Sequence, residues 1–143
     1  MRILVINGPN INLLGIREPA IYGNETFSDL LALLKQTSMD ENIDIIQFQS
    51  NHEGEIVDKI QQAMGVVDGI VINPAAYTHT SIAILDALKA VQIPAVEVHI
   101  SDPMQREPFR HTSYAGIACV KTIRGHGIAG YREAIVYLKE YLQ

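Results

Sequence analysis

Several side chains that can hydrogen-bond or transfer a proton follow short apolar runs of this sequence. Asn10 comes shortly after RILVI, and Asn73 and His79 come after GIVI. His99 and Ser101 lie in HISD, directly after AVEV. Each alone is typical of an ordinary turn or structural position. Together they offer directed hydrogen bonds and, through histidine, proton transfer near neutral pH. If the apolar runs are neighbouring strands, these side chains meet and suit a small ligand with many oxygen atoms.

Glu97 stands two residues before His99 in PAVEVHIS, so both side chains leave a strand on the same face. A carboxylate in a buried strand is costly unless it is paired. We therefore interpret Glu97 as accepting a hydrogen bond from a ring N–H of His99, directly or through a neighbour. Such a bond would fix the tautomer of His99 and raise its basicity. An edge strand that leaves Glu97 in water is the alternative.

The stretch NGPNINLLGIREPAIYG, residues 7–23, is a second place for chemistry. Its seventeen residues join a strand pattern to a helix pattern, where about 2–6 are usual. It carries Arg17 and Tyr22, and a nearby guanidinium favours the phenolate form of a tyrosine. We predict a lid over about residues 8–24 that forms an activated base on closing over substrate. A solvated Arg17 and a Tyr22 that merely anchors the lid fit the same pattern.

These side chains need a scaffold, and the remaining sequence predicts one. Nearly continuous, β-branched-rich apolar runs alternate with amphipathic segments, which indicates a parallel sheet with helical crossovers. The number of strands favours the α/β, flavodoxin-like, doubly wound fold with a five-stranded parallel sheet, as a single domain over residues 1–143. The expected strands are Arg2–Asn7, Ile43–Gln47, Gly69–Ile72, Ala95–His99 and Ile117–Lys121, and the expected helices are about Thr26–Thr37, Glu53–Met64, Ser81–Val91 and Gly130–Leu142.

Composition narrows the classes of function. The chain has 143 residues, 48% of them apolar, and a net charge of −5, which gives a nucleic-acid partner no electrostatic support. Its one cysteine, Cys119, cannot form an internal disulfide, as is usual in a reducing compartment. The apolar run at the N-terminus is too short for a signal peptide or a membrane span. We therefore expect a cytoplasmic protein without nucleic-acid or membrane partners.

Other chemistries fit the sequence poorly. The motif GHGIAG at residues 125–130 has dinucleotide-binding spacing, but the chain ends too soon for the second strand and acidic residue that such a site needs. We interpret it as a tight turn with close helix–sheet packing. A receiver domain would need a carboxylate where Asn73 stands, and NGPNIN is not a flavin phosphate loop. The five histidines lack metal-ligand spacing, and the lysines lie mostly on helix patterns.

Five stretches together resemble the type II 3-dehydroquinate dehydratases. They are NGPNINLLGIREPAIYG, NPAAYTHTS, EVHISD, REPFRHTSY and the glycine-rich turn before GY, in the family's order and over nearly the whole chain. The resemblance implies a flavodoxin-like enzyme without cofactor or metal, assembled as a homododecamer built from trimers. The implied reaction is anti elimination of water from 3-dehydroquinate to give 3-dehydroshikimate, in the shikimate or quinate pathway.

The resemblance also implies roles for individual residues. Tyr22 would be the base, Arg17 would hold it as phenolate, and Asn10 would help to bind the enolate oxygen. His99 would protonate the leaving hydroxyl while Glu97 orients it. The implied substrate-binding positions are Asn73, His79, Ile100, Ser101 and Arg110, with Asp86 reaching into the site of a neighbouring subunit.

Two features depart from the family pattern. Ala76 is interpreted as standing where NPGAYTHTS has glycine, which would cost about 1 kcal/mol if the backbone there has positive φ. The segment KTIRGHG is more basic than usual. Two rival classes are a nucleotide- or flavin-binding module and a non-catalytic interaction protein on the same fold. The first predicts stabilisation by nucleotide, and the second predicts indifference to loss of Tyr22 and Arg17.

Overall fold

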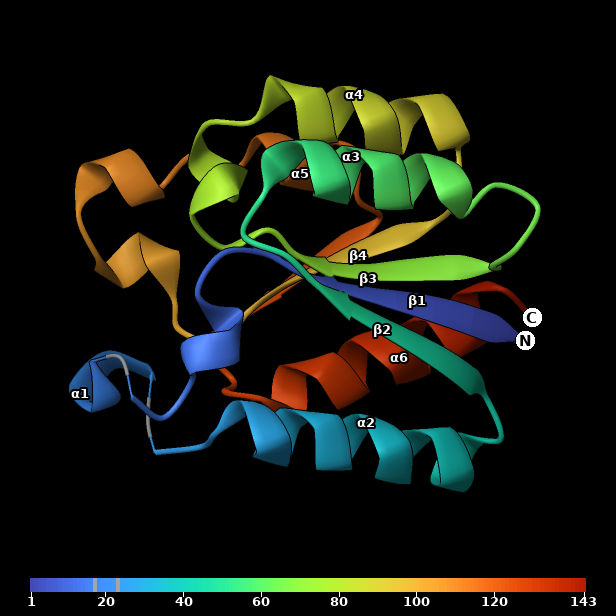
Figure 1. Cartoon of the computed structure of the whole chain (residues 1–143), viewed down its shortest axis with the longest axis horizontal. Coiled ribbons are helices and arrows are strands. Elements are labelled where there is room, and N and C mark those ends of the chain that lie inside the picture. Colours follow the sequence, from blue (N-terminus) through green and yellow to red (C-terminus); the bar gives the residue numbers. More distant parts are fainter. Residues whose placement is uncertain (17, 23) are drawn as a thin grey trace.

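Five short strands form one parallel sheet in the order β2-β1-β3-β4-β5 (Figure 1). The computed structural model describes residues 1–16, 18–22 and 24–143, with the side chain of Tyr22 left out. The strands are β1 (Arg2–Asn7), β2 (Asp44–Gln49), β3 (Gly69–Asn73), β4 (Ala95–His99) and β5 (Lys121–Arg124). This order confirms the flavodoxin-like fold predicted from the sequence.

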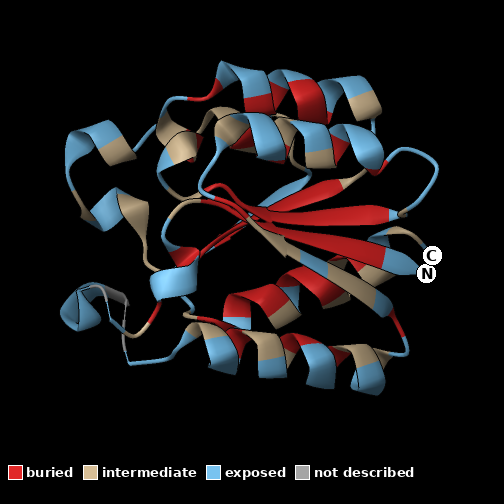
Figure 2. Ribbon diagram, in the orientation of Figure 1, coloured by how far each residue is buried: buried red, intermediate tan, exposed pale blue. Residues whose placement is uncertain are grey.

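Helices cover both faces of the sheet. On one face lie α2 (Phe27–Glu41) and α6 (Ala129–Tyr141), and on the other lie α3 (Glu53–Gln62), α4 (Ile82–Val91) and the short α5 (Tyr114–Ile117) (Figure 1). Alternate residues of β1 serve the two cores: Ile3 and Val5 pack on the α2/α6 side, Leu4 and Ile6 on the other. Figure 2 shows the resulting buried stripe along the central strands. The alternation explains why β1 reads as a continuous apolar run.

Local signals set the helix boundaries. The Thr26 side chain accepts a hydrogen bond from the backbone of Asp29, whose carboxylate bonds back to the Thr26 N–H, and this capping box starts α2. The helix ends at Glu41, later than expected, because Asn42 supplies a left-handed residue at φ 53°. Ser81 caps α4 in the same way as Thr26 caps α2, by accepting from the Ile84 N–H at 2.9 Å.

The fifth strand was predicted wrongly at Ile117–Lys121. Residues Tyr114–Ile117 form α5 instead, and β5 begins at Lys121. Ser113 caps α5 by accepting from the backbone of Gly116, and the apolar side chain of Ile117 is 63% exposed. An apolar run alone cannot distinguish such an exposed turn from a strand. The second strand is also displaced, to Asp44–Gln49, a smaller error at its ends.

The long loop after β1 contains two helical turns, η1 (Ile11–Leu13) and α1 (Pro19–Tyr22). It lies at the carboxyl end of the sheet with η2 (Ala75–His79), η3 (Pro103–Gln105) and η4 (Pro108–Arg110) (Figure 1). Arg17 and Gly23 lie outside the described residues. The proposed chemistry of Arg17 and of the Tyr22 side chain therefore stays a prediction.

The alanine that replaces the family's glycine is Ala75, not Ala76 as expected. Counted from Asn73, the glycine of NPGAYTHTS falls on Ala75. Ala75 has a left-handed backbone at φ 54°, whereas Ala76 is not among the residues with positive φ. The interpretation was displaced by one residue, and the strain it anticipated is present at Ala75.

The GHGIAG motif forms the turn that the sequence analysis preferred over a dinucleotide site. Gly125 and Gly127 have positive φ, and their N–H groups donate to backbone carbonyls between His99 and Ser101. A Cβ on Gly130 would lie 3.4 Å from side-chain atoms of Val98 and Ile123. The glycines thus tie the segment after β4 to the start of α6 and bring this helix close to the sheet.

Candidate active site

A cavity opens at the carboxyl ends of the strands, where the sequence placed the reactive residues. Its walls come from the loop after β1, from η2, from the end of β4 and from the segment that carries η3 and η4. Apolar side chains such as Leu14 and Pro103 form part of the wall. The polar residues that line the cavity are Asn10, Asn73, His79, His99, Ser101, Arg106 and Arg110.

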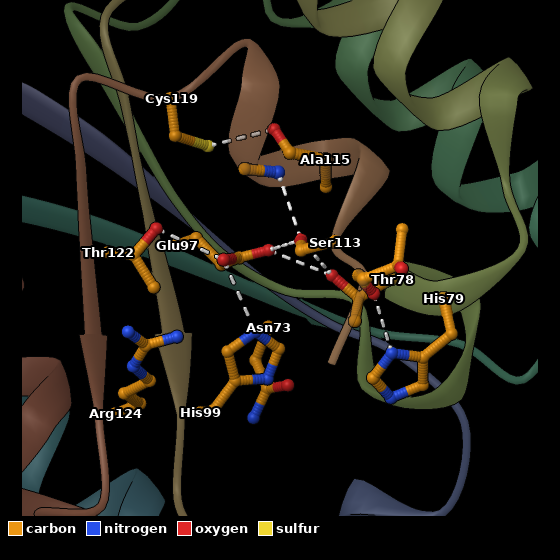
Figure 3. Close-up of polar contacts among 12 residues, drawn as sticks. Asn73, Thr78, His79, Glu97, His99, Ser113, Ala115, Cys119, Thr122 and Arg124 are labelled. Atoms are coloured by element: carbon orange, nitrogen blue, oxygen red, sulfur yellow. Dashed lines mark hydrogen bonds and ion pairs between the residues drawn. The ribbon is translucent and has the colours of Figure 1, made fainter. Parts of the chain in front are cut away.

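Glu97 and His99 form the interaction that the period-two spacing predicted. The His99 Nε2 atom lies 3.3 Å from Oε1 of Glu97, whose side chain is 1% exposed. Because a carboxylate only accepts, Nε2 of His99 carries the hydrogen, and Nδ1 is the nitrogen that Glu97 leaves for other partners. Figure 3 shows the pair within a group of hydroxyl side chains. The alternative of a solvated Glu97 is wrong.

Three hydroxyl groups donate to the same carboxylate. Thr78 Oγ1 and Ser113 Oγ donate to Oε2, the former at 2.8 Å, and Thr122 Oγ1 donates to Oε1 at 3.1 Å (Figure 3). Gly116 allows α5 to approach, since a Cβ there would lie 3.0 Å from Oε1 of Glu97. The carboxylate is therefore held from the η2 side, from α5 and from β5.

This surrounding keeps Glu97 charged although it is buried. Burial alone would raise its pKa, but the hydrogen bond and charge of His99 and the hydroxyl donors lower the pKa to about 2. The nearby thiol of Cys119 behaves oppositely, since burial and the charge of Glu97 raise its pKa to about 12. Cys119 is therefore a thiol and a poor nucleophile at neutral pH.

His79 and Arg110 meet the cavity from η2 and η4. Nδ1 of His79 lies 2.8 Å from the carbonyl oxygen of Thr112, so this nitrogen carries a hydrogen. Burial lowers the pKa of His79, and the nearby His99 and Arg110 act in the same direction. Neutral His79 then offers Nε2 as an acceptor. The Nε of Arg110 donates to Glu107 at 2.8 Å, which leaves the two terminal nitrogens for an anionic ligand group.

Asn10 lies in the loop after β1 and lines the cavity with a left-handed backbone at φ 69°. Asparagine adopts this conformation more readily than most residues. Its N–H donates to the side chain of Asn51 at 3.1 Å, which ties the start of the loop to the segment after β2. Ile100 and Ser101 also line the cavity, directly after β4.

One predicted residue lies elsewhere in this chain. Asp86 is exposed on α4 and is not among the residues that line the cavity. Conversely, Arg106 lines the cavity but was not singled out in REPFRHTSY. Thr78 and Ser113 were also missed, although both stand in quoted stretches, Thr78 directly before His79 and Ser113 three residues after Arg110. Their hydroxyls were the available signal, but their common target became visible only in the fold.

Two kinds of feature are absent from the part of the chain that the structure describes. No three His, Cys, Asp or Glu side chains there lie close enough together to hold a metal ion. None of the helices there is long and apolar enough to cross a membrane.

Comparison with known proteins places the chain in one family. The model of the class II dehydroquinase family matches residues 1–139. The chain belongs to the class II dehydroquinase family. This membership confirms the resemblance seen in the sequence and the predicted enzyme class, type II 3-dehydroquinate dehydratase.

Individual relatives agree with the family over nearly their full lengths. A 3-dehydroquinate dehydratase of Caldicellulosiruptor saccharolyticus is 54% identical over 142 residues, covering 99% of this chain and 98% of the relative. A catabolic 3-dehydroquinase of Verticillium alfalfae is 52% identical, covering 99% and 95%. The crystal structure of a type II dehydroquinase from Butyrivibrio crossotus superposes with a TM-score of 0.95 at 52% identity, covering 97% of each chain.

Proposed function

We propose that this chain converts 3-dehydroquinate to 3-dehydroshikimate and water by anti elimination through an enolate. The observation that carries the proposal is the buried Glu97–His99 pair at a cavity lined with hydrogen-bonding side chains, in a chain of the dehydroquinase family. The reaction belongs to the shikimate pathway of chorismate and aromatic amino acid biosynthesis, or to the quinate pathway. We also propose a cytoplasmic location.

In the first step Tyr22 removes a proton from the carbon beside the substrate ketone. A tyrosine with its ordinary pKa of about 10 is a weak base at neutral pH. Arg17, on the same loop, would hold Tyr22 as phenolate by its positive charge. Asn10, which lines the cavity, would bind the enolate oxygen through a water molecule. Donors already placed where charge develops are worth about 10²–10³ in rate each.

In the second step the carbon–oxygen bond to the leaving hydroxyl breaks and the double bond forms. Protonated His99 gives its Nδ1 proton to that hydroxyl, which leaves as water. The Glu97 carboxylate supports this role because it accepts from Nε2 and offsets the positive charge of the ring. The proton taken by Tyr22 equals the proton given by His99, so the cycle consumes no acid or base.

The remaining cavity residues would bind the substrate. The terminal nitrogens of Arg110 suit its carboxylate in a bidentate pair. Asn73, His79, Ser101 and the backbone at Ile100 would hold its hydroxyl groups. We propose that the subunits form a homododecamer built from trimers, in which the exposed Asp86 reaches the site of a neighbouring subunit.

The test adds 3-dehydroquinate to the purified protein in buffer with a chelator and without cofactor. The expected result is a rise in the ultraviolet absorbance of the conjugated enone product, in proportion to the amount of protein. A flat trace from folded protein would contradict the proposal. A thermal shift with nucleotide in that case would favour the binding-module alternative.

The same assay tests the base. Tyr22→Phe keeps the ring and should fold normally, but turnover should fall by about 10³-fold or more because no other group removes the proton. Tyr141→Phe, at an exposed position of α6, is the control and should keep full turnover. Unimpaired turnover of Tyr22→Phe would contradict its role. The mechanism also predicts insensitivity to borohydride, since no lysine imine forms.

A further inference from the structure

A second polar cluster lies beside the cavity, and two of its three members have no place in the reaction described above. It consists of Asn7 at the end of β1, Asn73 at the end of β3 and Tyr131 in the first turn of α6. All three are buried, and Tyr131 and Asn7 are 0% exposed. Only Asn73 lines the cavity. We refer to these residues as the Tyr131 cluster.

The direction of every hydrogen bond in the Tyr131 cluster follows from one backbone group. The Ala75 N–H can only donate, and it lies 3.1 Å from Oδ1 of Asn73. The opposite end of that amide, Nδ2, therefore donates to the Tyr131 hydroxyl at 2.9 Å. The hydroxyl has one proton, which it donates to Oδ1 of Asn7 at 2.5 Å. If the amide of Asn73 or Asn7 turned by 180°, two donors or two acceptors would face each other.

The tyrosine is suited to this task. Burial raises the pKa of Tyr131, against a smaller lowering by the bond from Asn73, so the side chain stays a neutral hydroxyl that both accepts and donates. It reaches the cluster because the glycine-rich turn sets α6 close to the sheet. The Nδ2 atom of Asn7 has no hydrogen-bond partner among the described residues. A buried polar group left in this state is costly, which indicates that the cluster serves something other than stability.

We infer that Tyr131 is a positioning residue for the substrate. Its buried hydroxyl fixes the Asn73 amide so that one Nδ2 hydrogen remains available to a substrate oxygen. This inference rests on the proposed function, in which Asn73 binds substrate. It assigns the GY of the glycine-rich motif to substrate binding, at a residue that does not itself line the cavity.

The test compares steady-state constants of Tyr131→Phe and the wild-type enzyme. Loss of the hydroxyl leaves the Asn73 amide held only through Oδ1, by the Ala75 N–H, and leaves Nδ2 without its acceptor. KM should therefore rise about 5- to 10-fold, while kcat stays within about 2-fold because proton transfer is untouched. Tyr137→Phe, on the same helix, is the matched control and should change neither constant. An unchanged KM, or a loss confined to kcat, would overturn the inference.

A second measurement separates positioning from a general structural effect. In an Asn73→Ala background, Tyr131→Phe should have no further effect on KM, because the residue through which it acts is gone. The same rise of KM in both backgrounds would overturn the inference. Absence of turnover in the wild-type enzyme would overturn the proposed function and the inference together. An active wild-type enzyme whose KM does not change in Tyr131→Phe would overturn the inference alone.

A further variant guards against misfolding. Asn7→Leu combined with Tyr131→Phe removes both side chains of the Tyr131–Asn7 hydrogen bond. The double variant should fold better than Tyr131→Phe alone, because it does not leave the Asn7 amide buried without that partner. It still leaves Nδ2 of Asn73 without its acceptor. The expected rise of KM is the same as for Tyr131→Phe, and a KM equal to that of the wild-type enzyme would contradict the inference.

Discussion

Two buried polar clusters flank the same cavity, and they differ in charge. Around Glu97, hydroxyl groups and His99 surround a carboxylate whose pKa is lowered to about 2. In the Tyr131 cluster every member is neutral, and the Ala75 N–H determines the direction of each of its hydrogen bonds. The charged cluster holds a carboxylate against the ring of His99, whereas the neutral one holds only amide and hydroxyl groups in place. This difference supports the proposed division, in which the charged cluster serves proton transfer and the neutral one serves binding.

The largest expected effect comes from the charged cluster. His99→Ala should lower kcat by about 10²–10⁴-fold, because it removes the proposed general acid. Glu97→Gln should lower kcat by about 10²-fold, because an amide can favour the wrong tautomer of the ring. The double variant should be no slower than His99→Ala alone, since Glu97 acts through His99. Steady-state rates of the three variants provide the measurement.

An exposed pair of the same residue types provides the control. His126 Nδ1 lies 2.6 Å from Glu133, but their side chains are 57% and 50% exposed. His126→Ala and Glu133→Gln should leave kcat unchanged. Independent, multiplicative losses from His99→Ala and Glu97→Gln would contradict a shared role.

A smaller effect should appear in acid stability. In the unfolded chain Glu97 has its ordinary pKa of 4.5, and in the folded protein about 2. Its stabilisation is fully present above pH 4.5, and it is lost as the pH falls toward 2 because only the unfolded chain takes up the proton. The free energy of unfolding of Glu97→Gln should therefore fall less steeply than that of the wild-type protein, by on the order of 3 kcal/mol over this window.

Urea unfolding at about pH 5 and about pH 3, at one protein concentration, measures most of this difference, on the order of 2 kcal/mol. Glu133→Gln, which removes an exposed carboxylate, serves as the control and should follow the wild-type protein. Parallel loss of stability in Glu97→Gln and wild type would show that the carboxylate is not held as described.

The smallest expected effect is on stability, at Ala75, whose N–H donates to the Tyr131 cluster. Ala75→Gly should stabilise the protein by about 0.5–1 kcal/mol, since glycine adopts the left-handed backbone without the cost that alanine carries. Ala76→Gly, one residue away and without positive φ, should give no gain. Thermal or urea unfolding of both variants decides the point. Stabilisation by Ala76→Gly instead would reverse the assignment of the strain.

The two clusters also differ in how far the sequence could predict them. The Glu97–His99 pair follows from the two-residue period of a strand, and the gathering of Asn73, His79 and His99 follows from the rule that strand ends meet in a parallel sheet. The partners Thr78 and Ser113 come from other elements. No spacing along the chain relates them to Glu97, so only the fold reveals their common target.

Tyr131 was hidden for a related reason. The motif GHGIAG before Tyr131 predicts the turn and the close packing of its glycines, but it does not predict the contact of Tyr131, because the reach of a side chain across a helix–sheet interface is not periodic. The position of the fifth strand was predicted wrongly because an apolar run does not reveal whether its side chains are exposed, as the side chain of Ile117 is. The displacement at Ala75 was an error of one position that the backbone angle corrected.

The most direct test of the two-cluster account is one set of initial rates over a range of 3-dehydroquinate concentrations. It compares the wild-type enzyme, Glu97→Gln and Tyr131→Phe side by side. The account predicts that Glu97→Gln loses kcat, whereas Tyr131→Phe gains KM at nearly unchanged kcat. Loss of the same constant in both variants would contradict the division of proton transfer and binding between the two clusters.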